Sequence, residues 1–416
     1  MTMEYWLYLH PYVYASIKKD TAMLYNTLNG KLLEYSQDKK GMIRRLIREL
    51  NSDKNLYVIS IKDEEIDSHI KTFINDLRTY YLGDLINKEH RPQRPIQLKP
   101  VLNLQRTLED FFSTGTGKNK ILTRDELPDY LNVITIYIND DCGEVCSFCD
   151  KAYKQFLCCT KRRNGEITVD LLRDLIDQTK NSNLYKLNIT GGNISRHSSF
   201  KRIVETLDTV PHIKEYYIYY KNVEEMPFLN GENNRLNIIL NFPLNAQVLE
   251  RCLELSNRPG LKRKFVFIVQ EIVDIDKAGE AVSSFSITDA ELIPYFNGNN
   301  ADFFKQKVFL DKASIIQGRP SMNNIFTRMA INTWDFKKLT VLSNGDVFAN
   351  LNQPKIGNLN RAHIFDMVER ELHRGKSWTK VRKNVNPCKS CVFNAMCPPI
   401  SNYEYAIGRY NLCNIM

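Results

Sequence analysis

The sequence predicts an α/β fold in which a partial barrel of six β/α units lies between a small N-terminal domain and a cysteine-rich C-terminal domain. Three observations lead to this prediction. Strand-like and helix-like segments alternate between residues 126 and 310, which is typical of a parallel sheet. A basic, proline-containing stretch at residues 88–100 separates this region from a different pattern before it. Seven of the ten cysteines stand in two groups, one directly after the first barrel strand and one near the end of the chain.

The first 87 residues predict a winged-helix-like domain. Strand-like runs occur at residues 12–17, 23–25 and 32–35, and Asn29-Gly30 marks a hairpin. Apolar residues at helical spacing follow at residues 43–50 and 66–77. A three-stranded sheet with about three helices can bind a peptide as an added strand, or DNA through a helix in the major groove. The few basic residues on these helices favour the peptide.

Residues 88–125 are predicted to be a linker, and residues 126–310 the partial barrel. Helices of the barrel are expected near residues 200–207 and 246–255, and Thr168 can cap another. Ligands of such a sheet bind at the carboxyl ends of its strands. The six barrel strands are expected at residues 131–138, 184–190, 215–220, 236–242, 264–270 and 307–310.

Residues 311–416 are predicted to be a third domain. It begins with a change of pattern, in which a hairpin at residues 339–342 and 347–349 turns about Asn344-Gly345. A cysteine-rich segment follows this hairpin.

Composition excludes several classes of protein. With 416 residues, 43% of them hydrophobic and 25% charged, the chain is not a disordered, collagenous or coiled-coil protein. No stretch approaches the roughly 18 apolar residues of a membrane span, and the start shows no secretory leader, so a soluble cytoplasmic protein without a membrane partner is expected. The net charge of +9 is dispersed, which disfavours nucleic acid as a partner. In a reducing cytosol, clustered cysteines indicate metal or redox chemistry.

The first cysteine group reads Cys142-Gly-Glu-Val-Cys146-Ser-Phe148-Cys149 and directly follows the first barrel strand. Three thiolates on a short loop can bind three irons of a [4Fe-4S] cluster and leave the fourth iron open to a small molecule. A structural zinc site normally has four protein ligands, and no fourth Cys or His lies at zinc-finger spacing here. Three packed core cysteines are the remaining alternative. The spacing, with Phe148 before the last cysteine, resembles the CxxxCxΦC signature of the radical SAM superfamily.

This resemblance extends to the end of the second strand. Gly191-Gly192-Asn193 resembles the superfamily's GGE segment, which contacts the amino group of S-adenosylmethionine (SAM). Asn193 replaces the usual Glu, and a neutral amide lacks the strength of a charge-assisted hydrogen bond. On the family pattern Asn241 is a further SAM contact, although a polar residue at a strand end is also common. With Phe148, these residues form the cofactor-binding set that the resemblance implies.

The C-terminal cysteine group can hold either a zinc ion or a second [4Fe-4S] cluster. Its members are Cys388, Cys391, Cys397 and Cys413. Beside the first motif, the group resembles the SPASM domain, whose cysteines hold two auxiliary clusters. Asn350 and Ser401 stand where that pattern has cysteines. The resemblance therefore implies one auxiliary cluster, held by the four C-terminal cysteines, and two [4Fe-4S] clusters in all.

Together these features resemble radical SAM/SPASM maturases of ribosomally made peptides. The resemblance implies that an external donor reduces the first cluster, that SAM is cleaved to a 5′-deoxyadenosyl radical, and that this radical abstracts hydrogen from a precursor peptide. Residues 1–87 would bind the leader of that peptide, and the auxiliary cluster would transfer an electron. No protein side chain is assigned to the chemical step.

Two other functions stay open. The chain also resembles degenerate radical SAM proteins of double-glycine-leader peptide systems, so it can be a non-catalytic, leader-binding partner of another maturase. It can also be a radical SAM enzyme that acts on RNA through its N-terminal domain. Of the other cysteines, Cys252 is expected in the core, whereas Cys158 and Cys159 either pack locally or take part in the chemistry.

Overall fold

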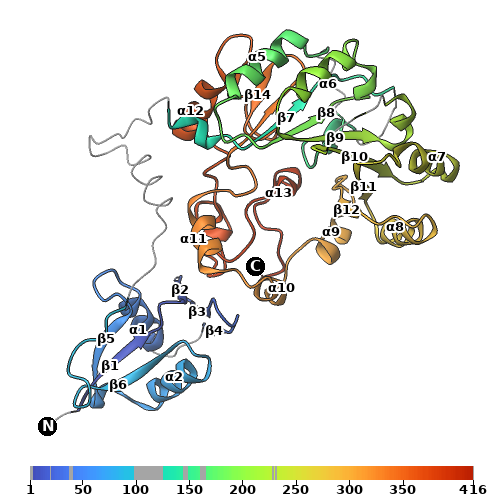
Figure 1. Cartoon of the computed structure of the whole chain (residues 1–416). Helices are drawn as coiled ribbons and strands as arrows, with labels where there is room; N and C mark the ends of the chain where they lie inside the picture. Colours follow the sequence, from blue (N-terminus) through green and yellow to red (C-terminus); the bar gives the residue numbers. More distant parts are fainter. Residues whose placement is uncertain are drawn as a thin grey trace.

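The computed structural model describes residues 3–18, 20–36, 41–97, 125–143, 149–159, 165–226, 229 and 232–415, and for residues 149 and 150 only the backbone. Within these ranges, a small N-terminal domain lies at one end of the molecule and a large sheet flanked by helices at the other (Figure 1). None of the helices in the described ranges has both the length and the apolar character required to span a bilayer.

The N-terminal domain contains two three-stranded antiparallel sheets, ordered β5-β1-β6 and β2-β3-β4. Its elements are β1 Glu4–Leu9, β2 Val13–Ile17, β3 Ala22–Asn26, β4 Leu32–Tyr35, α1 Met42–Leu50, β5 Val58–Lys62, η1 Asp63–Glu65, α2 Ser68–Thr79 and β6 Gly83–Asn87. Gly30 takes a φ of 75° in the β3–β4 turn, as the Asn-Gly pair predicts. The expected single three-stranded sheet is wrong for the described residues, because a second three-stranded sheet is present. The helical elements are α1, η1 and α2, which agrees with the expected number of about three.

The large sheet has nine strands in the order β12-β11-β10-β9-β8-β7-β13-β14-β15. Its strands are β7 Val133–Tyr137, β8 Lys186–Thr190, β9 Ile213–Tyr219, β10 Asn234–Asn241, β11 Lys262–Val269, β12 Ala290–Pro294, β13 Lys338–Val341, β14 Asp346–Phe348 and β15 Gly357–Asn358. Strands β7 to β12 pair in parallel, and β13 joins them beside β7, also in parallel. The expected hairpin, β13 with β14, therefore extends the barrel sheet.

Helices cover one face of this sheet. Between β7 and β12 they are α5 Val169–Thr179, η3 Ile194–Arg196, α6 Phe200–Asp208, η4 Tyr220–Glu225, α7 Ala246–Ser256 and α8 Ile272–Ser284. The short helix α4, Cys149–Ala152, instead packs through Ala152 against Ile239 and Ile268 on the other face. The expected cap is present, since Thr168 Oγ1 accepts from Leu171 N at 3.1 Å. Figure 1 shows α5 and α6 lying together over β7 and β8, and their apolar residues share one core with the strands.

The strands alternate between two environments. Ile134 and Ile136 of β7, like Leu236 and Ile238 of β10, are buried beneath the helices. The residues between them, such as Thr135, face a cavity on the other side. Because β12 at one end and β13 near the other both contribute to this cavity, the sheet curves around it.

The sixth barrel strand is β12, Ala290–Pro294, which pairs in parallel with β11. The prediction of a strand at residues 307–310 is wrong. That segment follows helix α9 (Ala301–Lys307), where its apolar side chains pack against Phe303 and Phe304. It ends in a bridge between Leu310 and Cys413, so this apolar run supports the C-terminal cysteine group.

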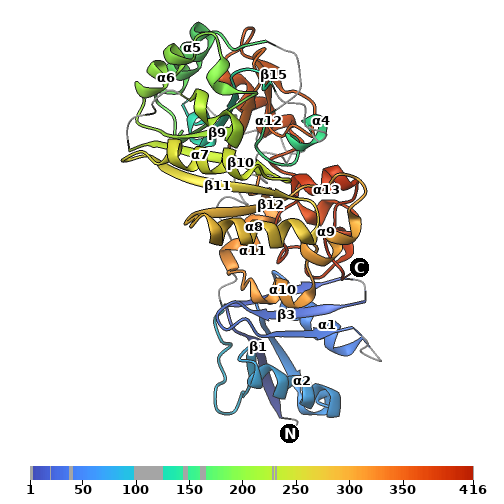
Figure 2. The ribbon, with the colours of Figure 1, turned by 90° about the vertical axis from the view of Figure 1, so that its right-hand side faces the viewer.

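The remaining elements are η2 Leu127–Tyr130, α10 Lys312–Gln317, α11 Met322–Ala330, α12 Ile364–Arg374, η5 Arg382–Asn384, η6 Cys388–Ser390 and α13 Asn402–Ile407. The N-terminal domain lies against this part of the chain, beside α10, and away from the parallel sheet (Figures 1 and 2). Tyr14, Met23 and Tyr25 share an apolar core with Phe393 and Met396. The two terminal parts of the chain therefore pack directly on each other.

Candidate active site

The first cysteine group follows β7 at the carboxyl edge of the parallel sheet. Cys142 is half-buried, and Gly143 N beside it donates to Asp141 Oδ1 at 3.0 Å. Cys149 begins helix α4. Cys146 and Phe148 lie outside the described residues, so their side chains stay predictions.

The expected glycine pair packs against the backbone just before this loop. Gly192 N donates to Asn139 O at 3.0 Å, and Asn193 N donates to Asp141 O at 2.6 Å. A Cβ atom on Gly191 would lie 2.5 Å from Asn139 Oδ1, and one on Gly192 would lie 2.2 Å from Asp141 O. Both positions therefore require glycine, because the segments that follow β7 and β8 are in backbone contact.

The side chain of Asn193 is fully buried and bonded within the protein. Its Nδ2 donates to Glu225 Oε2 at 2.6 Å, and its Oδ1 accepts from Ser195 N at 3.2 Å. Asn193, at the position where the sequence pattern has Glu, is thus paired with Glu225 of η4. Asn241, at the end of β10, accepts from the Tyr219 hydroxyl through Oδ1 at 2.6 Å.

A salt bridge fixes the carboxylate of Glu225. Arg196 of η3 donates from Nε at 2.9 Å and from Nη2 at 2.8 Å to its two oxygens. The hydrogen bond from Arg196 lowers the pKa of Glu225, against the opposing effect of partial burial. The guanidinium also lies against the cysteine loop, since a Cβ on Gly143 would be 2.4 Å from Arg196 Nη1. Glu225 is therefore held as a carboxylate beside this loop.

All four C-terminal cysteines line one small cavity, which Leu310, Arg382 and Asn394 help to enclose. Burial raises the pKa of Cys397 to about 12 and also raises that of Cys388. Thiols of this kind lose their protons when a metal binds. The donor set of four converging sulfurs fits a four-cysteine metal site.

No group of three potential ligands in the described ranges is arranged to hold a metal ion. A zinc ion requires its four sulfurs at about 2.3 Å from one centre. A cubane places its own irons and sulfides between the cysteines, so it suits a shared cavity better than a single ion does.

Arg382 anchors the C-terminal site. Its guanidinium contacts both oxygens of Glu404, at 2.7 and 3.2 Å, and lies 3.6 Å from Cys388 Sγ. It also donates to the carbonyl oxygens of Pro399 and Tyr410. Burial alone lowers the pKa of Arg382, but the Glu404 carboxylate outweighs burial and raises it above its usual value.

Amide side chains occupy the region where the family pattern has first-auxiliary-cluster cysteines. Asn350 Nδ2 donates to Asp335 Oδ1 at 3.0 Å and to Asn402 Oδ1 at 2.8 Å. Asn352 connects this network to the segment after α4 by donating to Lys154 O at 2.8 Å. Burial raises the pKa of Asp335 to about 7. A hydrogen-bonded network thus joins the C-terminal segment to the cavity.

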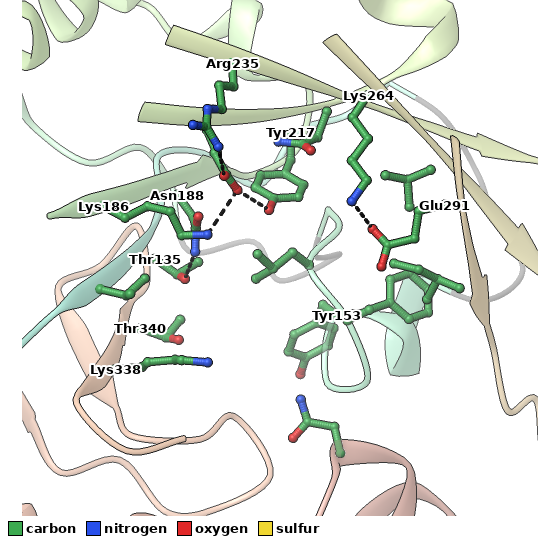
Figure 3. Close-up of a pocket in the computed structure, with 18 of the residues that line it drawn as sticks. Thr135, Tyr153, Lys186, Asn188, Tyr217, Arg235, Lys264, Glu291, Lys338 and Thr340 are labelled. Carbon is green, nitrogen blue, oxygen red and sulfur yellow. Dashed lines mark hydrogen bonds and ion pairs between the residues drawn. The ribbon is translucent and has the colours of Figure 1, made fainter. Parts of the chain in front are cut away.

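The cavity enclosed by the curved sheet has a volume of about 640 Å³. Figure 3 shows Lys186, Asn188 and Thr135 on one side of it and Lys264 with Glu291 on the other. Tyr153, shortly after α4, also lines the cavity. The cavity therefore extends from the amino-terminal ends of the strands to the segment that follows the cysteine loop. A cavity of this size and polarity suits a small molecule or a few residues of peptide.

Comparisons with known proteins give only distant similarities. No family model and no curated protein matches the chain. Among solved structures, it is similar to Streptococcus suis SuiB bound to S-adenosylmethionine, with 13% identity and a TM-score of 0.47 over 98% of this chain and 97% of that one. It is also similar to SuiB bound to precursor peptide SuiA, with 14% identity and a TM-score of 0.47 over 98% of both chains.

Sequence reasoning missed Glu225, Arg196 and the residues that line the cavity. No sequence signal links Arg196 to Glu225, because the contact arises only when η3 and η4 lie side by side. The cavity did leave a signal. Polar residues alternate with apolar ones along β8, as in Lys186 and Asn188, and this period of two marks a second, polar face.

Proposed function

We propose that this chain is a radical SAM peptide maturase that holds two [4Fe-4S] clusters, binds SAM and modifies a ribosomally made precursor peptide. The observation that carries the proposal is the position of the three-cysteine loop. It directly follows β7, and the segment that leads into it is hydrogen-bonded to the Gly191-Gly192-Asn193 loop after β8. Ligands of parallel α/β sheets bind at this edge.

In this proposal Cys142, Cys146 and Cys149 hold the first cluster, and Cys388, Cys391, Cys397 and Cys413 the second. With SAM, the first cluster would supply a 5′-deoxyadenosyl radical once an external donor has reduced it. The protein binds and orients these groups and excludes water from them. Four protein thiolates leave the second cluster without an open iron, which favours electron transfer as its role.

The function is tested by measuring 5′-deoxyadenosine after anaerobic reconstitution, reduction and addition of SAM. An active maturase forms 5′-deoxyadenosine. When the precursor is present, either more 5′-deoxyadenosine is formed or its amount matches the amount of modified peptide. Loaded clusters without any 5′-deoxyadenosine would favour the non-catalytic alternative, a leader-binding partner of another maturase. That alternative is favoured by Asn350 and Ser401, which replace cluster ligands of the family pattern. Salt-sensitive binding of RNA would favour an RNA substrate.

We further propose that Glu225 supplies the carboxylate that Asn193 lacks. It lies 2.6 Å from Asn193 Nδ2 and is fixed by Arg196. Glu225→Gln should weaken SAM binding about fivefold, because a neutral hydrogen bond replaces a charge-assisted one at the amino group. Calorimetry on the anaerobic, cluster-loaded protein measures this change.

Glu224→Gln is the matched control. Glu224 is the neighbouring residue of η4, and its carboxylate is exposed and 3.2 Å from Arg251 Nε. Its replacement should leave SAM affinity unchanged. Equal affinities for the native protein and Glu225→Gln, or equal losses in both variants, would contradict a role for Glu225.

For the leader peptide we propose the edge of β4, which pairs only with β3 among the described strands. This strand borders a cavity of about 670 Å³ whose opposite wall is α10, and Leu28 and Tyr81 are exposed large apolar side chains of this domain. Asn26 N donates to Lys31 O at 2.9 Å, so alternate residues bond to β3 and Glu34 directs its backbone N–H outward. A leader in extended conformation can pair with this edge.

Deletion of residues 1–87 does not test this site cleanly, because it also uncovers the core shared with the C-terminal segment. Glu34→Pro removes one outward N–H from an edge strand, where proline is tolerated. It should lower turnover of the precursor at low concentration several-fold, whereas peptide-independent SAM cleavage stays unchanged. The substrate is sought among short reading frames with a Gly-Gly step beside the gene.

Glu34→Ala is the control, since both variants lose the carboxylate that pairs with Lys312 but only proline loses the donor. If the two variants process the precursor equally fast below saturation, the β4 edge is not the leader site.

A further inference from the structure

The cavity enclosed by the curved sheet is unusually basic for a barrel interior. Barrel interiors are commonly filled by branched apolar side chains. Here six basic and four acidic residues line the cavity, and of the basic ones Arg263 directs its guanidinium away, to Leu253 O and Ser256 Oγ of α7. The basic ones are Lys186, Arg235, Lys262, Arg263, Lys264 and Lys338, and the acidic ones are Glu215, Asp289, Glu291 and Asp335.

Two of the acidic side chains are neutralised by neighbours on adjacent strands. Glu215 of β9 lies 3.2 Å from Lys186 Nζ and 3.6 Å from Arg235 Nη1. Glu291 of β12 lies 2.7 Å from Lys264 Nζ. These pairs stand on either side of the cavity in Figure 3. Lys338, on β13, has no such ion pair with a carboxylate of the described residues.

Lys338 directs its ammonium group toward the cavity without a close carboxylate. Within the described ranges no carboxylate oxygen lies within 4.0 Å of its Nζ, which is 5.5 Å from the centre of the Trp334 ring. Burial lowers the pKa of Lys338, the charge of Asp335 opposes this effect, and Lys186 adds to it. Asp335 itself is bonded to Asn350. An anion near Lys338 would therefore replace the hydration that this ammonium has lost.

Strand register places a second ammonium group nearby. Val133 of β7 pairs with Lys338 on one side and with Lys186 on the other. Val133, which also lines the cavity, lies between the two lysines in this row. Thr135 and Thr340 form the next row toward the carboxyl edge and also line the cavity. Two ammonium groups and two hydroxyls thus border one corner of the cavity, a set suited to a carboxylate.

Two buried amides supply hydrogen-bonding groups of another kind. Among the residues that the structure describes, Asn188 Oδ1 and Asn237 Nδ2 have no hydrogen-bond partner, although both residues line the cavity and are only 5% and 7% exposed. Asn188 Nδ2 donates to Thr135 Oγ1 at 3.0 Å, which leaves its oxygen as the free acceptor. An unpaired acceptor and an unpaired donor match the N–H and C=O groups of a peptide main chain.

We propose that this cavity binds a carboxylate-bearing segment of the substrate peptide, with Lys338 and Lys186 holding the carboxylate and with Asn188 and Asn237 bonded to the main chain. This inference rests on the proposed peptide-modifying function and specifies the chemistry of the substrate. It places the bound carboxylate about four residues, or about 13 Å along the strands, from the carboxyl edge. The residue that reacts would then lie a few positions away from the acidic one.

Three probe peptides test the proposal on the full-length, cluster-loaded protein. They are acetyl-Gly-Gly-Glu-Gly-Gly-amide, its Gln analogue, and acetyl-pentaglycine with a free C-terminal carboxylate. Dissociation constants are measured by ligand-observed NMR. The Glu peptide should bind about fivefold more tightly than the Gln peptide. Equal or tighter binding of the free-acid peptide would assign the carboxylate to the end of the substrate chain, with the same site.

Lys338→Met should abolish the preference for the carboxylate. Lys201→Met, on the outer helix α6, makes the same change in net charge and should preserve it. Lys338→Gln, a second variant, and circular dichroism of all three verify folding. Equal binding of the Glu and Gln peptides to the native protein, or an undiminished preference in folded Lys338→Met, would overturn the proposal.

Peptide-independent formation of 5′-deoxyadenosine is measured in the same samples. A native protein that prefers the Glu peptide but forms no 5′-deoxyadenosine would contradict the proposed radical function while supporting the carboxylate site. Formation of 5′-deoxyadenosine by a native protein that shows no preference for the Glu peptide would contradict only the carboxylate site.

Discussion

Replacing Cys142 by alanine is expected to abolish formation of 5′-deoxyadenosine and to halve the iron content of the reconstituted protein. The native chain should bind about eight irons, two cubanes' worth, and the variant about four. The physical reason is that two thiolates cannot hold a cluster that leaves one iron open. Iron analysis, the visible spectrum of the reduced protein and product chromatography measure the effect.

Cys252→Ala is the control for this variant. Cys252 is 2% exposed and packs in the main apolar core beneath the helices, apart from both cysteine groups. Its replacement should preserve both the iron content and SAM cleavage. Twelve irons in the native protein, or four irons with one zinc, would show that the C-terminal cysteines have been misassigned.

Replacing Arg382 by methionine is expected to destabilise the C-terminal domain by about 3–5 kcal/mol. The change leaves the carboxylate of Glu404, which is 0% exposed, without a counter-charge and removes the donors to Pro399 O and Tyr410 O. Urea denaturation followed by tryptophan fluorescence reports the loss through Trp378, a buried residue of the adjoining core.

Two variants sharpen this test. Arg409→Met removes an arginine whose Nε donates to Asn411 Oδ1 at 2.9 Å and should cost far less. The double variant Arg382→Met/Glu404→Leu should recover part of the stability, because an apolar pair carries no buried charge. A loss of less than about 1 kcal/mol in Arg382→Met would mean that the pair does not support the fold.

Much of the parallel sheet could be predicted from the sequence, because apolar strands alternate with amphipathic helices and Thr168 caps one of them. The edge strand β12 could not be predicted in this way. Its sequence, Ala-Glu-Leu-Ile-Pro, has neither an apolar run nor a regular alternation. Residues 307–310 offered the stronger apolar signal, and a short run of that kind is ambiguous between a strand and a buried connection.

The cysteine groups could be located because their spacing along the chain carries the information. The contacts between residues that lie far apart in the sequence could not be predicted from spacing. Asn193 contacts Glu225, and Lys338 and Lys186 come to lie on either side of β7, only after the strands have taken their order in the sheet. β13 comes late in the chain yet pairs with β7, the first strand of the parallel set. Such contacts depend on topology, which local spacing does not encode.

The apolar contact between the N-terminal and C-terminal domains has a consequence for biosynthesis. Tyr14, Met23 and Tyr25 leave the ribosome long before Phe393 and Met396, which cover them and follow about 370 residues later in the chain. At about 5–20 residues per second, translation of this chain leaves that surface exposed for tens of seconds. Incomplete chains therefore carry an open hydrophobic surface, and premature termination or slow translation near residue 390 should lead to aggregation rather than to a functional fragment.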